Sequence, residues 1–320
     1  MTPRCRIIIV SHNCADYLNR CLAALLAQTA TDFEVVVVDN ASQDLDRVAM
    51  PDDARFTLVA LSENVGFAAG NNLGARGAQA PWLVTLNPDA FPEPDWLERL
   101  HAAAAANPGV AMFGSTQLSA ADPSLLDGEG DRYSIFGLAW RAGCGRAGRR
   151  PYFTGEVFSP CAAAAMYRRA LFEEVGGFDE RFFCYCEDID LGFRMRLRGA
   201  RCLQVGDAVV HHVGSGVSKR YGDFSLYHGI RNIVWTLIKN VPFPLIVLVV
   251  PLHAAAMGYF ALFRWRWSNP GTAERAMRDA IGGLPEVLRQ RRAIQASRNV
   301  TLAALMRVIT WSPMAVKRRL

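Results

Sequence analysis

Polar side chains follow three apolar runs of the sequence that predict buried strands. They are Ser11 and Asn13 after residues 7–10, Asp39 after residues 35–38, and Asn87 and Asp89 after residues 82–86. In an open α/β sheet, ligands bind outside the carboxyl ends of the strands. Carboxylate and amide oxygens at such an edge suit a hard divalent cation and the polar groups of a ligand. The spacing therefore predicts a ligand site at one edge of a sheet.

The elements that position these side chains alternate along the chain. Apolar, β-branched runs predict strands, and apolar residues at helical spacing predict helices between them. The strands are expected at Ile7–Val10, Val35–Val38, Phe56–Leu61, Trp82–Leu86, Val110–Phe113, Ala162–Tyr167 and Ala208–Val213. The helices are expected at Asp16–Ala27, Phe67–Gln79, Asp95–Ala106, Ala170–Val175, Leu191–Arg198 and Phe224–Ile238. This alternation predicts a parallel α/β sheet with helices on both faces, interrupted by a long irregular insertion over residues 116–150.

Several classes of protein are disfavoured by the motifs and charges. No G-x-G-x-x-G follows the first strand and no G-x-x-x-x-G-K-[ST] occurs, which disfavours a dinucleotide dehydrogenase and a P-loop NTPase. The eight cysteines include no C-x-x-C pair, so we expect reduced, mostly buried thiols rather than a zinc ribbon. Residues 1–216 carry 19 basic and 26 acidic side chains, which predicts no nucleic-acid partner. The first residues lack the apolar core of a signal peptide and predict a strand instead.

Five segments resemble, in order, the motifs of family 2 inverting glycosyltransferases. They are VVVVDNAS at 35–42, ENVGFAAGNNLG at 63–74, LNPDA at 86–90, GGFDERFFCYCEDIDLGFR at 176–194 and HHVGSG at 211–216. The resemblance covers about residues 5–240 and is closest to bacterial rhamnosyltransferases that build cell-wall or surface polysaccharides. It implies the α/β fold class of the GT-A nucleotide-diphospho-sugar transferases, a Rossmann-like mixed sheet flanked by helices.

The resemblance also implies which residues bind the donor. Asp39 is expected to accept the imide N–H of a uracil or thymine ring, although a carboxylate there also suits a cap on the next turn. Small residues beside Asn64 let the backbone approach ribose and phosphate, or else belong to a glycine-relaxed helix on the sheet. The predicted nucleotide-sugar-binding set is Ser11, Asn13, Asp39, Asn64, Gly66, Asn71 and Asn87.

Asn87-Pro88-Asp89 resembles the D-x-D metal motif of the family, with Asn in place of the first Asp. A bound Mg²⁺ or Mn²⁺ is expected, because the leaving group is a nucleoside diphosphate and because Asp89 offers a carboxylate. The tripeptide is also a strong turn signal, and a turn can present the ligand. Adjacent residues on a strand point to opposite faces, so only one of His211 and His212 can face the site. The resemblance implies a histidine at this place that contacts the metal or the diphosphate, and we assign it to His211. Arg231-Asn232 resembles the Arg-Asn pair of the family, and the fork of Arg231 suits the diphosphate of donor or acceptor.

Glu187 and Asp188 form an adjacent acid pair. The resemblance implies that Asp188 is the general base that takes the proton from the acceptor hydroxyl. A single displacement needs such a base on the acceptor side and cationic assistance on the diphosphate side. Glu187 is expected to orient Asp188 or to contact the acceptor. Asp190 is expected to be a helix N-cap, and Arg194 and Arg196 are expected to form surface or interdomain ion pairs.

The C-terminal part of the sequence is basic and apolar. Residues 217–320 carry 16 basic and 4 acidic side chains, and Val241–Phe263 is 23 residues long without a formal charge. That length allows a membrane span, but a crossing would send a basic tail out of the cytosol, against the positive-inside tendency. We therefore predict a helix or hairpin lying in the inner leaflet, with Trp265, Trp267 and Trp311 at headgroup level. The alternative is an ordinary buried helix pair.

These expectations combine into one hypothesis. Residues 1–222 form a catalytic domain, with a nucleotide-sugar half over about 1–115 and an acceptor half over about 116–222, and residues 223–320 form a helical membrane-associating extension. The enzyme transfers a sugar, best taken as L-rhamnose from dTDP-rhamnose, to a polyprenyl-diphosphate-linked saccharide at the cytoplasmic face of the inner membrane, as a peripheral or monotopic protein. The alternative is a catalytically degenerate scaffold that binds sugar nucleotides in a polysaccharide assembly complex.

Overall fold

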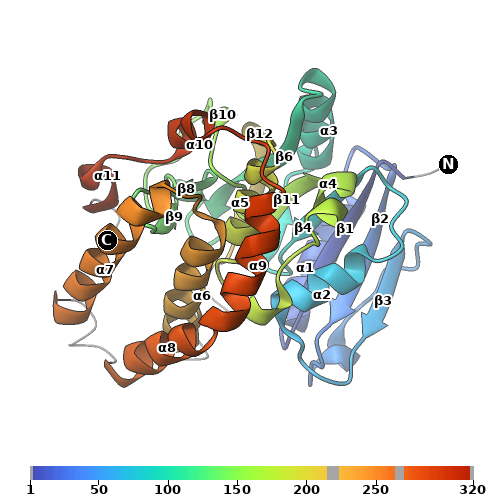
Figure 1. Cartoon of the computed structure of the whole chain (residues 1–320). Helices are drawn as coiled ribbons and strands as arrows, with labels where there is room; N and C mark the ends of the chain where they lie inside the picture. The colour runs from blue at the N-terminus through green and yellow to red at the C-terminus, as the bar shows by residue number, and fades with distance from the viewer. Residues whose placement is uncertain (1–2, 215–222, 264–269, 318–320) are drawn as a thin grey trace.

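The computed structural model describes residues 3–214, 223–263 and 270–317 (Figure 1). The centre of this described part is a ten-stranded mixed sheet, as the resemblance implies. Its main path runs in the order β10 (Gly155–Glu156), β12 (Arg201–His212), β6 (Val110–Ser119), β11 (Ala164–Arg168), β4 (Trp82–Leu86), β1 (Cys5–Ser11), β2 (Phe33–Asp39) and β3 (Phe56–Ala60). The short strands β5 (Ala90–Pro92) and β7 (Leu126–Gly128) pair with β12 and β6.

The direction of β11 decides which loops meet at the edge of the sheet. β1 to β4 pair in parallel, but β11 lies between β4 and β6 and runs antiparallel to both. The wholly parallel sheet expected from the alternation is therefore wrong here, because β11 follows the long insertion and not a crossover helix. The residues before β11 consequently lie beside the end of β4, where the Asn87 amide donates to the Ala163 carbonyl at 2.9 Å.

Helices cover both faces of the sheet, as the alternation predicts. α1 (Ala15–Leu26) and α3 (Trp96–Ala106) bury their apolar residues on one face. α2 (Gly66–Ala75), α4 (Arg169–Glu174) and α5 (Glu187–Leu197) pack on the other. A Cβ on Gly70 would lie 2.8 Å from Val10, and one on Gly74 would lie 2.5 Å from Ile8. Close packing of α2 on β1 therefore explains these two glycines without a ligand.

The insertion is less irregular than the sequence indicates. β6 continues to residue 119, and the strands β8 (Asp131–Tyr133) and β9 (Ala139–Arg141) form a small antiparallel sheet. Tyr133 and Phe158 stack with ring centroids 5.1 Å apart, and both rings contact Phe193 of α5 edge-on. Aromatic packing therefore fixes the insertion against the helix that begins with the acid pair.

α5 begins earlier than expected. It starts at Glu187, after the single 3₁₀ turn Glu180–Phe182 and three residues with positive φ, which are Phe183, Tyr185 and Cys186. The chain thus turns sharply into the helix one turn before the predicted start. Asp190 lies inside α5 and is not its N-cap. Arg194 and Arg196 are buried and do not lie at the surface.

The predicted helical extension is present. It comprises α6 (Phe224–Asn240), α7 (Leu245–Phe263), α8 (Pro270–Gly282), α9 (Leu284–Ala296), α10 (Leu302–Val308) and α11 (Pro313–Lys317). One buried cluster joins Phe193 of α5 to Leu237 of α6, Val249 of α7 and Leu305 of α10. The predicted boundary at 222/223 adjoins residues 215–222, which lie outside the described part of the chain. A shared core crosses this division, so α6 packs against the same body as α5.

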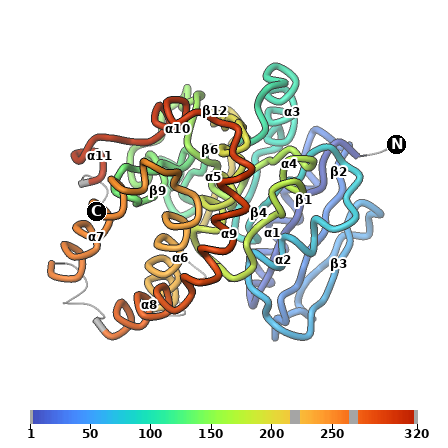
Figure 2. The backbone as a smooth tube through the Cα atoms, in the orientation of Figure 1, coloured from blue at the N-terminus to red at the C-terminus, as the bar shows by residue number. Residues whose placement is uncertain are grey.

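α7 carries one buried stripe and an uncharged surface. Leu245, Val249, His253, Met257 and Phe260 are buried at helical spacing. By length and composition alone, α7 can cross a membrane, and 28% of its most apolar window is buried. α7 lies far from β3 across the molecule (Figure 2). Of the tryptophans expected at headgroup level, Trp311 is exposed, while Trp265 and Trp267 lie outside the described residues.

Candidate active site

A cavity of about 640 Å³ opens at the edge of the sheet where β1 and β4 end. Its volume falls within the range of small-ligand pockets. The walls come from the ends of those strands, the start of α2, the insertion, and the loop that leads into α5. The structure brings six of the predicted site residues together along this cavity: Asn64, Gly66, Asn87, Asp89, Glu187 and Asp188.

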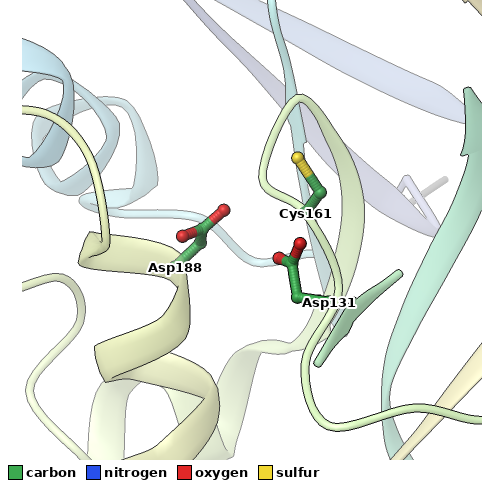
Figure 3. A group of neighbouring side chains, drawn as sticks. All are labelled: Asp131, Cys161 and Asp188. Carbon is green, nitrogen blue, oxygen red and sulfur yellow. The ribbon is translucent and has the colours of Figure 1, made fainter. Parts of the chain in front are cut away.

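Asp188 faces two side chains that belong to other parts of the chain (Figure 3). Ligand atoms of Asp131, Cys161 and Asp188 all lie within 4.8 Å of one another. Asp188 accepts hydrogen bonds from the amides of Ala162 at 3.1 Å and Ile189 at 2.8 Å. Burial nevertheless outweighs these bonds and raises the pKa of the Asp188 carboxyl. Such a carboxylate is a stronger base than an exposed one.

Two further acids, Glu187 and Asp131, lie close to Asp188. Burial, with the charge of Asp188 as a second cause, raises the pKa of Glu187 and of Asp131 well above their ordinary values. Sequence reasoning did not single out Asp131. It lies in the insertion, where no helical or strand period marks it, and only the long stretch of polar and glycine residues hinted at a functional loop. Tertiary folding alone brings it to Asp188.

The loop before α5 is held by α6. The Asn232 side-chain amide donates to the carbonyls of Phe182, Cys184 and Tyr185 at 2.8–2.9 Å. The Arg231 guanidinium donates to the carbonyls of Arg181 and Phe182, both at 3.1 Å. Arg231 is therefore occupied with backbone oxygens and does not line the cavity. This arrangement differs from the predicted contact with a diphosphate: here the Arg-Asn pair shapes the turn that presents Glu187 and Asp188.

His212, and not His211, lies beside Asp89. Alternation along β12 turns His212 into the cavity, with its Nε2 3.3 Å from Asp89 Oδ1 and 3.3 Å from Asn87 Nδ2. His211 points away and lies 3.4 Å from Glu93. The geometry therefore favours His212, rather than the predicted His211, as the histidine that faces the site.

Asp127 holds the other ring nitrogen of His212, with 2.7 Å between Nδ1 and Oδ2. Burial disfavours the charged ring, but the hydrogen bonds to Asp127 and Asp89 outweigh burial and raise the pKa of His212 to about 9. Asp127 also pairs with Arg141, which lines the cavity from the end of β9. These residues link the insertion to the Asn87–Asp89 turn.

Only some of the residues predicted to bind the nucleotide sugar line the cavity. Asn64 accepts from the Gly66 amide at 2.9 Å, and Gly66 has a φ of 86° and faces Phe183, so a Cβ there would clash with the ring. Asp39 caps the following turn through Oδ2, which accepts from the Ser42 amide at 2.9 Å. Its Oδ1 is buried, with no hydrogen-bond partner within the described ranges.

Three other predicted residues, Ser11, Asn13 and Asn71, form contacts outside the cavity lining. Ser11 Oγ lies 3.3 Å from Cys14 Sγ, and Asn13 Oδ1 accepts from the Gln43 amide at 2.8 Å. Asn71 donates to the Phe67 carbonyl within α2 at 2.9 Å. None of the three lines the cavity. His12, next to Ser11 in the sequence, and Asn40, next to Asp39, do line the cavity, and the predicted set included neither.

A sequence profile of glycosyl transferase family 2 matches residues 6–176, more than half of the chain. The chain belongs to this family. It is therefore a glycosyltransferase, as the five ordered motifs implied.

The sequence of this glycosyltransferase is similar to those of proteins of bacterial polysaccharide synthesis. N-acetylglucosaminyl-diphospho-decaprenol L-rhamnosyltransferase of Mycobacterium tuberculosis is 29% identical over 245 residues, which cover 66% of this chain and 77% of the relative. Rhamnosyltransferase WbbL of Escherichia coli is 27% identical over 209 residues, which cover 61% of this chain and 78% of that protein. The O-antigen biosynthesis protein RfbC of Myxococcus xanthus is 30% identical over 225 residues, covering 66% of this chain and 17% of RfbC.

Solved structures resemble the glycosyltransferase in fold. The mannosyltransferase PcManGT of Pyrobaculum calidifontis, in complex with GDP-Man and Mn²⁺, has a TM-score of 0.52 and 20% identity, covering 93% of this chain and 85% of that chain. TarS residues 1–349 of S. aureus have a TM-score of 0.56 and 15% identity, covering 93% and 88%. At these identities the likeness establishes the fold, and it agrees with the predicted GT-A architecture.

Among the described residues that line the cavity of the glycosyltransferase, two groups of side chains have the donor atoms to hold a cation. Asp89 offers a carboxylate and His212 an imidazole Nε2, and the opposite ring nitrogen of His212 is held by Asp127. That outer carboxylate is the usual partner of a metal-binding histidine. The second group, Asp131, Cys161 and Asp188, includes a thiol, which is a poor ligand for Mg²⁺. The Asp89–His212 group therefore fits a divalent cation better.

Proposed function

We propose that this glycosyltransferase transfers L-rhamnose from dTDP-rhamnose to a polyprenyl-diphosphate-linked saccharide in cell-wall or surface polysaccharide synthesis. The observation that carries the proposal is one cavity with a half-buried base, Asp188, on one wall and the Asp89–His212 group on another. The named activity of the Mycobacterium tuberculosis relative supports both the sugar and the lipid-linked acceptor. Transfer assays with dTDP-, UDP- and GDP-sugars, with the anomeric configuration of the product read by NMR, test it directly.

The proposed reaction is one displacement at the anomeric carbon. The acceptor hydroxyl oxygen forms a bond to this carbon while the bond to the diphosphate oxygen breaks. Asp188 takes the hydroxyl proton, and the nucleoside diphosphate leaves with the bonding electrons, so the anomeric configuration inverts. Asp39 stays a predicted contact of the base, and its unpartnered Oδ1 supports that role.

A divalent cation, Mg²⁺ or Mn²⁺, would be held by Asp89 and His212 with Asn87 beside them. When bound, it neutralises charge on the departing diphosphate. Arg141 lines the same cavity and supplies a fixed positive charge from the insertion. Its guanidinium suits a phosphate or carboxylate of either substrate.

Substitutions of the proposed cation ligands test whether His212, and not His211, binds the cation. Asp89→Ala and His212→Gln should each weaken Mn²⁺ binding in the presence of dTDP by at least about 10–100-fold, the usual loss even for an outer ligand partner. His211→Gln is the matched control, because its ring pairs with Glu93 outside the cavity. Calorimetry or Mn²⁺ electron paramagnetic resonance measures the binding. Equal losses in the two histidine variants would contradict the assignment, and full transfer activity in a chelator would contradict metal dependence.

The alternative function is a catalytically degenerate scaffold. Such a scaffold would bind the same sugar nucleotides but would need no catalytic base. Asn87 in place of the first acid of the metal motif favours the rival mildly. The half-buried Asp188, whose pKa is raised by desolvation, favours an enzyme. Donor binding without donor hydrolysis or transfer, with every nucleotide sugar tested, would favour the scaffold.

We also propose that the enzyme lies on the cytoplasmic face of the inner membrane through α7. The exposed surface of α7 carries no charged side chain, and Val247, Leu248, Leu262 and Phe263 are all exposed. An uncharged apolar helix face of this kind is typical of a membrane-interface helix. The basic surroundings suit an anionic leaflet.

Polar substitutions on α7 test the membrane proposal in the full chain. Val247→Gln with Leu262→Gln should weaken binding to anionic vesicles by at least about tenfold, because each fully buried aliphatic side chain contributes about 1.5–3 kcal/mol. Leu26→Gln with Leu58→Gln is the matched control, since both are exposed leucines of the sheet domain. Circular dichroism checks that both variants are folded. Unchanged sedimentation of the α7 variant would contradict the proposal.

A further inference from the structure

A second cavity lies outside the active site, between the loop after α6 and the C-terminal half of α9. It has a volume of about 350 Å³ and is lined by Phe243, Arg291, Arg292, Gln295 and Arg298. Three guanidinium groups around one small cavity form an unusual concentration of positive charge. In the described part of the chain, none of these arginines forms an ion pair with an acidic side chain.

Two of the lining residues form the floor of the cavity. Arg291 Nη1 donates to the carbonyls of Ile238 and Val241, at 2.6 and 2.7 Å. Gln295 donates to the carbonyl of Asn240 at 2.9 Å. These bonds occupy the last carbonyls of α6, which would otherwise repel an anion.

The other two arginines are available to a ligand. Arg292 is exposed, and Arg298 Nη1 is buried without a hydrogen-bond partner among the described residues. A buried guanidinium N–H without a partner is costly, and an anion in the cavity would satisfy it. The planar guanidinium fork matches phosphate oxygens better than any other side chain.

Phe243 connects this cavity to α7. Phe243 is 71% exposed, and it lies two residues before the helix whose outer face is uncharged and apolar. A ligand in the cavity would therefore have phosphate against the arginines and an apolar region beside Phe243 and α7. A phospholipid in a bilayer has this arrangement, whereas a free phosphate has no apolar part.

We propose that the cavity formed by Phe243, Arg291, Arg292, Gln295 and Arg298 binds the phosphate of an anionic phospholipid and thereby orients the enzyme on the membrane. This inference rests on the proposed membrane association and adds a defined headgroup site to it. The site lies apart from the catalytic cavity, whose lining shares no residue with it.

The test uses the full chain and vesicles of phosphatidylcholine with and without phosphatidylglycerol. Arg292→Gln with Arg298→Gln should weaken binding to the anionic vesicles about 10–30-fold, since each basic residue near an anionic surface contributes about 1 kcal/mol. Binding to neutral vesicles and transfer to a soluble acceptor should not change. Arg278→Gln with Arg307→Gln is the control, because it removes the same charge from α8 and α10, outside the cavity. We expect that control to lose less than about threefold.

The outcomes distinguish the headgroup site from the membrane association on which it rests. Equal weakening by both double variants would show that diffuse charge, and not the cavity, binds the membrane. No weakening by the cavity variant would also overturn the headgroup site. If the wild type binds neither kind of vesicle, the membrane association itself fails. Thermal stabilisation of the wild type by inorganic phosphate without vesicles, lost in the cavity variant, would assign the cavity to a soluble anion instead.

Discussion

Asp188→Asn should reduce sugar transfer by about 10²–10⁴-fold while dTDP and donor binding stay unchanged. The amide has nearly the same shape, and its oxygen can still accept from the Ala162 amide, as Asp188 Oδ2 now does at 3.1 Å. It cannot take a proton from the acceptor hydroxyl. Steady-state transfer kinetics and donor calorimetry measure the two quantities separately. Normal turnover would mean that Asp188 is not the base.

Asp207→Asn is the matched control, because Asp207 is an exposed carboxylate on β12. It should leave transfer unchanged. The pH profile adds an independent readout: because burial raises the pKa of Asp188, the acid limb of kcat should lie above the ordinary aspartate range near about 4. Activity should therefore fall as the pH drops through the raised value, and this limb should vanish from the residual activity of Asp188→Asn.

Lys239→Met should lower the free energy of unfolding by about 3–5 kcal/mol, the usual cost of removing one partner from a buried ion pair. Lys239 is 1% exposed, and its ammonium lies 2.7 Å from Asp179 and 2.7 Å from Asp190. Methionine fills the space but leaves two buried carboxylates with less compensating charge. Urea unfolding followed by circular dichroism measures the change. Arg278→Met, at an exposed ion pair on α8, should cost less than about 1 kcal/mol.

The buried ion-pair network of Lys239, Asp179, Asp190 and Arg181 also predicts how the free energy of unfolding depends on pH. Burial opposes the ionisation of Asp179, but hydrogen bonds and charges from Arg181 and Lys239 outweigh burial and hold its pKa well below the usual range. A depressed folded-state pKa gives stability that is present above the unfolded value and is lost as the pH falls toward the folded one. In Lys239→Met this dependence on acid should be smaller. A Lys239→Met protein as stable as the wild type would contradict the role assigned to the network.

The network also explains why sequence reasoning misplaced Asp190. An acid just before an apolar periodic run is a typical N-cap signal, and the local pattern supports that interpretation. In the structure, Asp190 lies one turn inside α5 and binds Arg194 at 2.8 Å and Asn240 at 2.7 Å. Asn240 lies fifty positions further along the chain, at the end of α6. No local pattern contains that partner.

Sequence by itself determined the elements and the family. Strands at residues 7–10, 35–38 and 82–86 follow from short apolar runs, and α1 and α3 follow from apolar residues at helical spacing; all lie within a few residues of the observed bounds. These signals are local, because burial on one face repeats with the period of the backbone. The five ordered motifs likewise predicted the GT-A fold and the glycosyltransferase family, and both are confirmed.

Only the tertiary structure decided which side chains meet in the cavity. His212 replaces His211 because the register of β12 against β5 and β6 sets which face each residue occupies. Asp131 lies beside Asp188 because Tyr133 of the insertion packs on Phe193 of α5. Arg231 binds backbone carbonyls because α6 packs against the loop before α5. Each of these outcomes depends on contacts between segments far apart in the chain. Local composition and spacing determine how a segment folds, but they do not encode the distance between two segments that approach only when the core is packed.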